Sequence, residues 1–368
     1  MKRCWRLAAA LGILCGGRAA RAHQQTTTFA EIVYPVGDGD VGWRIRFRAA
    51  DLARIAPDGH AAEAIAAGLR VTATVNGDTR ACPRGATSLT PDPAATEPTS
   101  VFAARFACGG GARTLHLRYD LLFDRDPYHA SYARVDVGQP ANEADPDAST
   151  AVFYDRQREV AIDVQQPTPA WRTAVTYARL GIAHILTGAD HLAFLAALLL
   201  AAAVRGRRPA HAASPGEAIR SSAAIVSAFT VAHSITLATQ VLRPGMLPTR
   251  WVEPAIAFSV AVVAVENLLP RPPRARWALV FGFGLVHGLG FASALREIGL
   301  PRRGLVLALV SFNAGVEAGQ LLVVALALPL LVAAARRNPA RYERWGLRAA
   351  SAVLAAAAVV AFFSRLPR

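Results

Sequence analysis

The sequence predicts a two-part membrane protein: an exported all-β, sandwich-like domain followed by an all-α polytopic membrane bundle of about six helices. Of the 368 residues, 53% are apolar, which is a high share for a soluble protein. The apolar residues are unevenly spread, because residues 23–170 are mixed whereas residues 171–368 are dominated by Ala, Leu and Val. Short alternating segments fill the first part and long apolar runs fill the second, which indicates strands followed by membrane helices.

The N-terminus has the pattern of a signal peptide. A basic start at residues 2–6 precedes an apolar core at residues 7–15, which is too short to cross a bilayer. Ala20 and Ala22 provide the small residues of a cleavage site. We therefore expect residues 1–22 to be removed and the following domain to be periplasmic.

Residues 23–165 carry the strand signals of the exported domain. Residues 43–48 alternate apolar and charged side chains, as a half-buried strand does, and residues 71–75 run into the turn dipeptide Asn76-Gly77. Further strands are expected at residues 115–119, 151–154 and 160–164. Short strands separated by Gly, Pro, Asp and Asn predict a β-sandwich, and a linker is expected at 166–177.

Two cysteines remain after the predicted cleavage, Cys82 and Cys108, both in the exported domain. A disulfide is chemically permitted in that compartment. One pair at one spacing does not decide whether the bridge forms.

The membrane domain is expected at 178–364. Six apolar runs are long enough to cross a bilayer as helices. They lie at residues 178–204, 219–242, 251–269, 277–297, 304–334 and 347–364. If the β-domain is outside, the inner loops carry eleven Arg and the outer loops and tail seven, which agrees with the positive-inside rule for a bacterial inner membrane.

The net charge of +14 is explained by arginines that flank the predicted membrane helices. It is carried almost entirely by Arg, since Lys2 is the only Lys. A basic balance can indicate nucleic-acid binding, but here the Arg residues cluster at the ends of the apolar runs. We expect contact with lipid and no nucleic-acid partner.

Ionisable side chains inside the apolar runs form the candidate site. Such groups are costly in a bilayer and are expected to face the bundle interior. The metal ligands are predicted to be His184, which would capture the ion near the outer mouth, and a midplane group formed by Asp190, His191, His233 and His287, with Glu317 balancing the charge. On one continuous helix, His184 and His191 would share a face, with His184 about 10 Å nearer the outside.

Imidazole and carboxylate ligands suit borderline divalent metals such as nickel, cobalt or zinc. The alternative for single polar residues is interhelical hydrogen bonding, which applies most strongly to Asn313 and Gln320. The dense set around His191 favours a metal site, because it combines imidazole with carboxylate inside one apolar run.

At these residues the chain resembles the HupE/UreJ family of membrane proteins. The resemblance covers about residues 171–335. Its four motifs are His184-x5-Asp190-His191, residues 229–237 around His233, residues 283–292 around His287, and residues 312–320 with Glu317.

The resemblance implies a nickel or cobalt permease rather than an enzyme, with the divalent ion as the transported or bound species. Two other functions stay open: a metal-binding accessory or receptor protein without transport, and an intramembrane metalloenzyme. The ion, the direction and driving force of transport, the oligomeric state and any periplasmic partner of the β-domain are also open.

Overall fold

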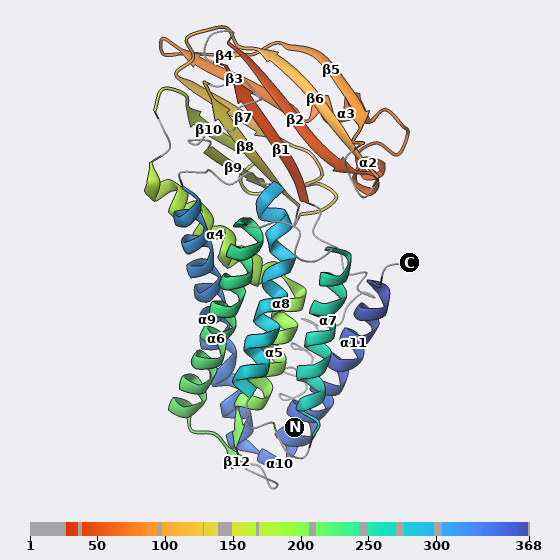
Figure 1. Cartoon of the computed structure of the whole chain (residues 1–368), viewed down its shortest axis with the longest axis vertical. Coiled ribbons are helices and arrows are strands. Elements are labelled where there is room, and N and C mark those ends of the chain that lie inside the picture. Colours follow the sequence, from red (N-terminus) through yellow and green to blue (C-terminus); the bar gives the residue numbers. More distant parts are fainter. Residues whose placement is uncertain are drawn as a thin grey trace.

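The computed structural model shows a β-sheet unit at one end of a helical bundle (Figure 1). It describes residues 27–35, 39–93, 98–127, 129–138, 149–166, 169–205, 211–242, 249–269, 276–297 and 304–366. The predicted signal peptide lies outside the described residues.

Two sheets form the N-terminal unit. The six-stranded sheet has the order β5-β6-β2-β1-β8-β9, and the four-stranded sheet has the order β10-β7-β3-β4. The strands are β1 (Thr27–Tyr34), β2 (Asp40–Arg48), β3 (Leu69–Val75), β4 (Asp78–Ala81), β5 (Arg84–Pro91), β6 (Thr99–Ala107), β7 (Thr114–Tyr119), β8 (Ala130–Val137), β9 (Ser149–Tyr154) and β10 (Glu159–Asp163).

The two sheets enclose one apolar core, which confirms the predicted sandwich. Trp43 and Phe47 of β2 and Phe102 of β6 are fully buried, and they share a cluster with Val71 of β3 and Leu117 of β7 from the other sheet. Alternate residues of β2 face inward while its arginines face solvent, because side chains alternate across a strand. The alternating pattern in the sequence therefore reports the real inner face.

The sequence predicted the turn at Asn76-Gly77, left the disulfide open, and did not reveal two short helices or the parallel pairing of two strands. Cys82 and Cys108 form a disulfide. Asn76 and Gly77 have φ values of 53° and 91°, as a two-residue hairpin turn between β3 and β4 requires. Two short helices, α2 (Ala49–Ile55) and α3 (Ala61–Ala67), lie between β2 and β3, and β1 pairs with β8 in parallel.

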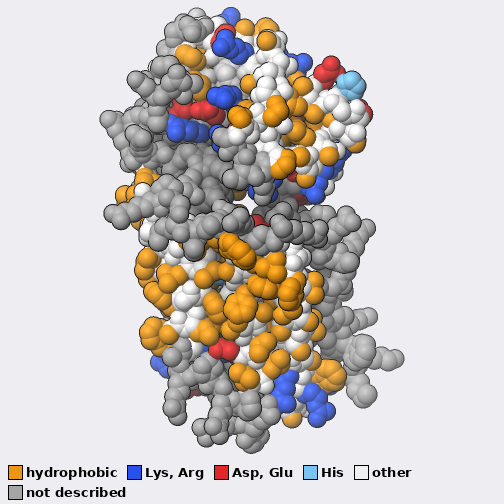
Figure 2. Space-filling view, turned by 45° about the vertical axis from the view of Figure 1, so that its right-hand side comes forward, with side chains coloured by type: hydrophobic (Ala, Val, Ile, Leu, Met, Phe, Trp, Pro, Cys, Tyr) orange, Lys and Arg blue, Asp and Glu red, His pale blue; other side chains and the backbone are white. Residues whose placement is uncertain are grey.

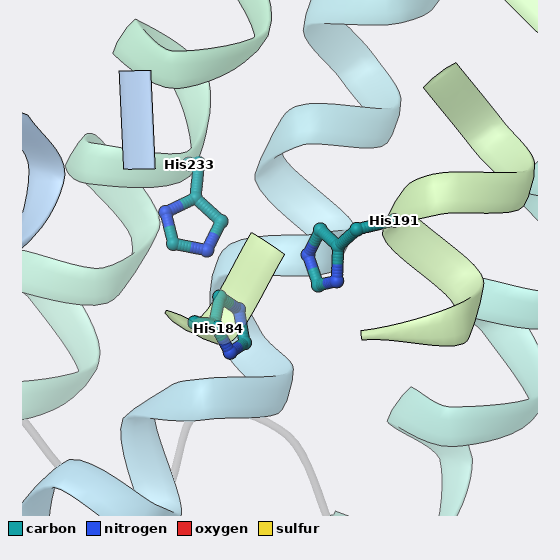
Figure 3. A group of neighbouring side chains, drawn as sticks. All are labelled: His184, His191 and His233. Carbon is teal, nitrogen blue, oxygen red and sulfur yellow. The ribbon is translucent and has the colours of Figure 1, made fainter. Parts of the chain in front are cut away.

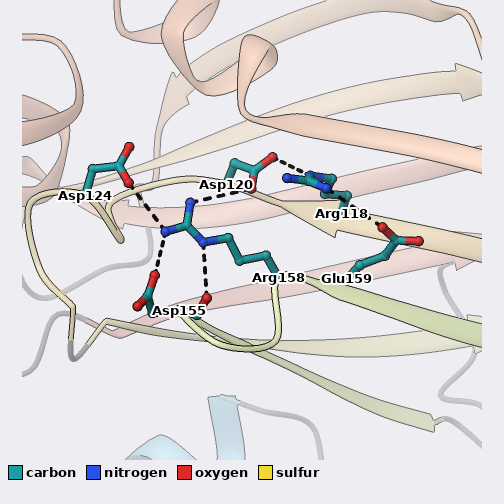
Figure 4. Close-up of polar contacts among 6 residues, drawn as sticks. All are labelled: Arg118, Asp120, Asp124, Asp155, Arg158 and Glu159. Carbon is teal, nitrogen blue, oxygen red and sulfur yellow. Dashed lines mark hydrogen bonds and ion pairs between the residues drawn. The ribbon is translucent and has the colours of Figure 1, made fainter.

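A network of charged side chains holds the turn before β10, the strand that leads into the helical bundle (Figure 4). Arg158 binds the carboxylates of Asp155 at 2.5 Å and Asp124 at 3.4 Å. Arg118 of β7 binds Asp120 at 2.7 Å and approaches Glu159 of β10 at 4.0 Å. These contacts connect the turn before β10 to the end of β7 and the loop after it.

Each of the six predicted membrane runs contains helix. The helices are α4 (Ala170–Thr187), α5 (Ala189–Ala202), α6 (Pro215–Leu242), α7 (Thr249–Glu266), α8 (Arg276–Glu297), α9 (Leu305–Arg337), α10 (Pro339–Arg341), a π-helical segment (Tyr342–Ala349) and α11 (Ala350–Ser364). Within the described residues, α6, α9 and the stretch Pro339–Ser364 are each long and apolar enough to cross a membrane.

The first run is not the single helix that the sequence predicted. Helices α4 and α5 are separated at Gly188 and meet at an angle of 69°, so the prediction of one continuous helix over 178–204 was wrong. Together the bent pair qualifies as one broken span or as a re-entrant segment. Pro254 in α7 and Pro329 in α9 lie inside helices that continue through them.

Glycines allow the closest helix contacts. A Cβ on Gly181 of α4 would overlap the carbonyl oxygen of Phe312 in α9, and one on Gly315 of α9 would overlap that of Ala178. In α8, a Cβ on Gly288 would lie 2.5 Å from the carbonyl oxygen of His233 in α6. Small residues let membrane helices approach closely, and here they bring α4, α6, α8 and α9 together.

The helical half carries a broad hydrophobic surface, whereas charged side chains gather on the β-sheet half and near the far end of the bundle (Figure 2). Large apolar side chains such as Leu330, Val353 and Phe363 point outward. This surface is expected of a protein that lies in lipid, since lipid-facing helix surfaces are apolar. The chain is therefore a membrane protein.

The sandwich is docked on the bundle. Tyr177 of α4 makes a hydrogen bond to Thr150 of β9 at 3.1 Å, and it shares an apolar cluster with Val152 of β9 and Leu237 of α6. The first half of α4 and the C-terminal end of α6 therefore lie nearest the β-domain. Helix α11 also ends on that side of the bundle (Figure 1).

Candidate metal centre

The candidate site is built on the break between α4 and α5. Gly188 has φ −76° and ψ 100°, an extended conformation that ends α4 while its N–H still donates to the carbonyl of His184. His184 therefore lies in the last turn of α4, and His191 lies in the first turn of α5. A 69° bend replaces the two helical turns that would otherwise separate them.

Three imidazoles converge at this break (Figure 3). The ring centroids of His184 and His191 are 4.5 Å apart, and that of His233 from α6 lies 6.2 Å from His184. One ring nitrogen of each histidine lies within 4.8 Å of the others. The expectation that His184 lies about 10 Å outward of His191 was wrong, because it assumed an unbroken helix.

The His233 ring is oriented by a hydrogen bond at Nδ1, which leaves Nε2 available as a metal ligand. Its Nδ1 lies 3.4 Å from the side-chain oxygen of Asn313, whose amide nitrogen in turn donates to the carbonyl of Leu309 at 2.9 Å. That bond orients the Asn313 oxygen as an acceptor, so Nδ1 of His233 carries the proton. The buried Nε2 of His233 has no hydrogen-bond partner among the described residues. A metal-binding histidine typically has this arrangement, with its second nitrogen oriented by a neighbouring oxygen.

His287 of α8 stands beside the three histidines. Its ring centroid lies 5.0 Å from that of His191, and its Nε2 lies 2.8 Å from the hydroxyl of Ser259 in α7. The Ser259 hydroxyl donates to the carbonyl of Ile256 at 2.6 Å, so Nε2 of His287 must be the donor to Ser259. The remaining nitrogen, Nδ1, is then a buried lone pair that has no partner within the described part of the chain.

Aromatic rings surround the imidazoles. Phe229 of α6 and Phe194 of α5 each lie 5.2 Å from the ring of His287, and Phe312 of α9 lies 5.7 Å from that of His184. Phe229 and Phe312 are buried. An apolar shell of this kind raises the strength of any coordination inside it, since it excludes competing water.

The predicted carboxylates do not join the histidines. The carboxylate of Asp190 lies 2.9 Å from the guanidinium of Arg365, which follows α11. Glu317 of α9 accepts a hydrogen bond from Ser227 of α6 at 2.9 Å. Among the described residues, the group with metal-binding spacing consists of the three histidines alone.

The spacing of these nitrogens is close to what a metal needs. Imidazole nitrogens bind zinc-like ions at about 2.0–2.1 Å, which places two ligand atoms about 3.4 Å apart in a tetrahedral site. The histidine nitrogens lie within 4.8 Å of one another. Small rotations of the side chains that move each nitrogen by about an ångström would bring them to the spacing of a tetrahedral site. The arrangement can therefore hold a borderline divalent ion through three neutral ligands, with His287 as a neighbour.

Three features of the site escaped the sequence. Ser259 orients His287, but a single serine in an apolar run has no distinctive sequence pattern. Arg365 binds Asp190, but in the sequence it is one of several arginines at the ends of apolar runs. The break itself had a signal: Gly188 stands directly before a helix start with an acidic residue, Asp190, in its first turn.

The comparison with known families agrees with these residues. The HupE / UreJ protein family matches residues 158–365 of the chain, which include the whole helical bundle. The chain therefore belongs to the HupE/UreJ family, as its motifs predicted. The family is associated with nickel and cobalt transport, and it comprises transporters and accessory proteins rather than enzymes. The chain has no significant match among curated proteins.

Proposed function

We propose that this chain is an inner-membrane permease for a divalent transition-metal ion, of the nickel or cobalt type, with its β-sandwich in the periplasm. The observation that carries the proposal is the group of His184, His191 and His233, gathered inside an apolar bundle at the break of a helix. Broken helices that expose polar groups at membrane depth are a recurring design of transport sites.

The ligand set suits transport better than permanent storage. Three neutral imidazoles offer three coordinate bonds but no negative charge, so the double charge of the ion is only partly balanced. Conduction requires that an ion bind well enough to enter and weakly enough to leave. A site without carboxylate ligands meets both conditions.

A route from the β-domain side toward the opposite end is marked by polar side chains. His233 is followed inward by Thr230, which donates to Gln320, and by Ser227, which donates to Glu317. Ser227 precedes His233 by six residues, so it lies about 9 Å further along α6, away from the β-domain. Glu317 then offers the ion its first carboxylate after the histidines.

Flux through purified protein tests this function. Proteoliposomes with the full chain are expected to accumulate radioactive nickel or cobalt, and His233→Ala is expected to reduce the initial rate at least tenfold. His60→Ala, which removes an exposed histidine of the β-domain, is the matched control and should transport normally. Normal flux in His233→Ala would refute the proposal.

Binding without flux would indicate the second function, an accessory or receptor protein. The docking of the sandwich on α4 favours this alternative, because α4 carries both Tyr177 at the docking contact and His184 at the metal group. A ligand of the β-domain would then act on the same helix as the metal. Isothermal titration of the variants beside the flux assay separates the two functions.

The proposed orientation is tested by labelling cysteines introduced one at a time in a background without Cys4 and Cys15, in which Cys82 and Cys108 are held in their disulfide. Cysteines at Ser214 and Asn338, at the end of the bundle away from the sandwich, should react with a membrane-impermeant maleimide only after the cells are opened. A cysteine at Ser364 should react from the periplasm. Reversed accessibility would contradict the periplasmic placement of the β-domain.

A further inference from the structure

The ion pair between Asp190 and Arg365 joins the metal group to the C-terminal end of the bundle. The two residues are 175 positions apart in the sequence, yet their side chains meet at 2.9 Å. Asp190 is the second residue of α5, directly before His191. Arg365 follows the last residue of α11, and both side chains are mostly buried, with 32% and 20% of their surface exposed.

The geometry separates Asp190 from the metal group even though it is next to His191 in the chain. Consecutive residues of an α-helix point about 100° apart, so when His191 faces the other histidines Asp190 faces sideways. There its carboxylate is engaged by a guanidinium, in a charge-assisted hydrogen bond that is among the stronger polar contacts in proteins.

The pair acts at the start of α5, next to the break between α4 and α5. The break at Gly188 removes the continuous hydrogen bonding that would fix the rotation of α5 relative to α4. Helix α11 packs along α7 and also contacts α5, so its end is a firm point of attachment. Fixing Asp190 fixes the first turn of α5, and with it the direction of the His191 ring.

We propose that Arg365 is a positioning residue of the metal site, and that Asp190 acts on the site through this ion pair rather than as a metal ligand. The inference rests on the proposed function, because it concerns the same histidines. Arg365 holds Asp190, Asp190 holds the start of α5, and this places His191 within reach of His184 and His233.

A double-mutant cycle on purified full-length protein tests the assignment, with Co(II) as the probe. Arg365→Gln and Asp190→Asn are each expected to weaken binding about tenfold, the lower end of the effect of losing a supporting residue at a metal site. The variant with both changes should bind within twofold of either single variant. If Asp190 is a ligand, Arg365→Gln releases its carboxylate and leaves the affinity unchanged or higher, which would overturn the proposal.

The spectrum of bound Co(II) gives a second measure that needs only one variant. At saturating metal, Asp190→Asn is expected to show the wild-type visible absorption, because the histidine ligands are unchanged. An altered band position or intensity in Asp190→Asn would show a lost ligand and would contradict the assignment. This measurement decides the question even where Arg365→Gln does not yield folded protein.

Arg348→Gln is the matched control. It breaks an ion pair of similar length, 2.6 Å to Glu343, on the same C-terminal stretch but before α11 and on the opposite side of the membrane bundle. Arg348→Gln should bind Co(II) with the affinity of the wild type. If it loses as much affinity as Arg365→Gln, the effect of Arg365→Gln is general destabilisation and the positioning role is wrong. His233→Ala separates this inference from the proposed function: if its affinity is normal the metal site is wrong, whereas if only the Arg365 variant is normal the positioning role alone is wrong.

Discussion

Replacing Gly188 by Ala should disturb the metal group directly. A Cβ at this position would lie 2.8 Å from Nδ1 of His191 and 2.6 Å from the carbonyl oxygen of His184. The backbone at Gly188 has φ −76°, which any residue adopts, so the effect of the change is purely steric. To reach the 3.4 Å of an ordinary contact, the His191 ring must retreat by about 0.6 Å.

That displacement acts on a site whose ligand atoms are already spread to 4.8 Å. Misplacing a ligand by a fraction of an ångström has an effect similar to losing a supporting residue, which costs about 10- to 100-fold in metal affinity. We therefore expect Gly188→Ala to weaken Co(II) binding about tenfold or more, or about 1.4 kcal/mol. Titration of the purified protein with Co(II), followed by absorbance, measures the change.

The control for this substitution is Gly282→Ala in α8, the helix that carries His287. A Cβ at Gly282 would have nothing within 4 Å. Alanine is favoured over glycine inside a helix by roughly 0.5–1 kcal/mol, so this variant should be as stable as the wild type or more so, with normal metal binding. Affinity in Gly188→Ala within twofold of the wild type would refute the proposed geometry of the break.

Three further outcomes are expected. Asn313→Leu should weaken Co(II) binding about tenfold in titration, because Nδ1 of His233 loses the acceptor that orients it, and unchanged binding would contradict that role. Gly315→Leu should push α4 and α9 apart at a cost of about 1–3 kcal/mol or more, seen as a lower thermal transition in detergent, whereas a normal transition would disprove the tight crossing. The double variant Cys82→Ser, Cys108→Ser should lower the unfolding free energy of the sandwich by about 3.5 kcal/mol, because the disulfide closes a loop with a sequence separation of 26. Denaturant unfolding of the full chain measures this change. A loss below about 1 kcal/mol would show that the disulfide contributes little.

The strands and membrane helices could be predicted because their signals are local. The alternation in residues 43–48 reports burial on one face, and the structure buries the same side chains in the sandwich core. A long apolar run predicts a helix in lipid or in a protein core, whichever neighbouring helix it packs against. The parallel pairing of β1 with β8 could not be predicted, since strand partners far apart in sequence leave no trace in either strand alone.

The histidines could be selected from sequence, but their arrangement could not. The free-energy cost of histidine in an apolar run identified them, whereas the angle at Gly188 depends on how α4 and α5 pack in the bundle and cannot be read from the run itself. Asp190 was expected beside the metal because it precedes His191. Its partner, Arg365, lies 175 residues away at the end of the last helix, and only the packing of the bundle brings the two together.

The break also affects the charge felt by a bound cation. The C-terminus of α4 carries a partial negative charge and the N-terminus of α5 a partial positive one, and both act within one turn, where His184 and His191 lie. The first favours a cation and the second opposes it. Asp190 lies in the first turn of α5, at the positive end of that helix, but its charge is balanced by Arg365. The two helix ends therefore act on a bound cation with opposite sign, and the bend does not by itself supply the negative charge that three neutral imidazoles lack.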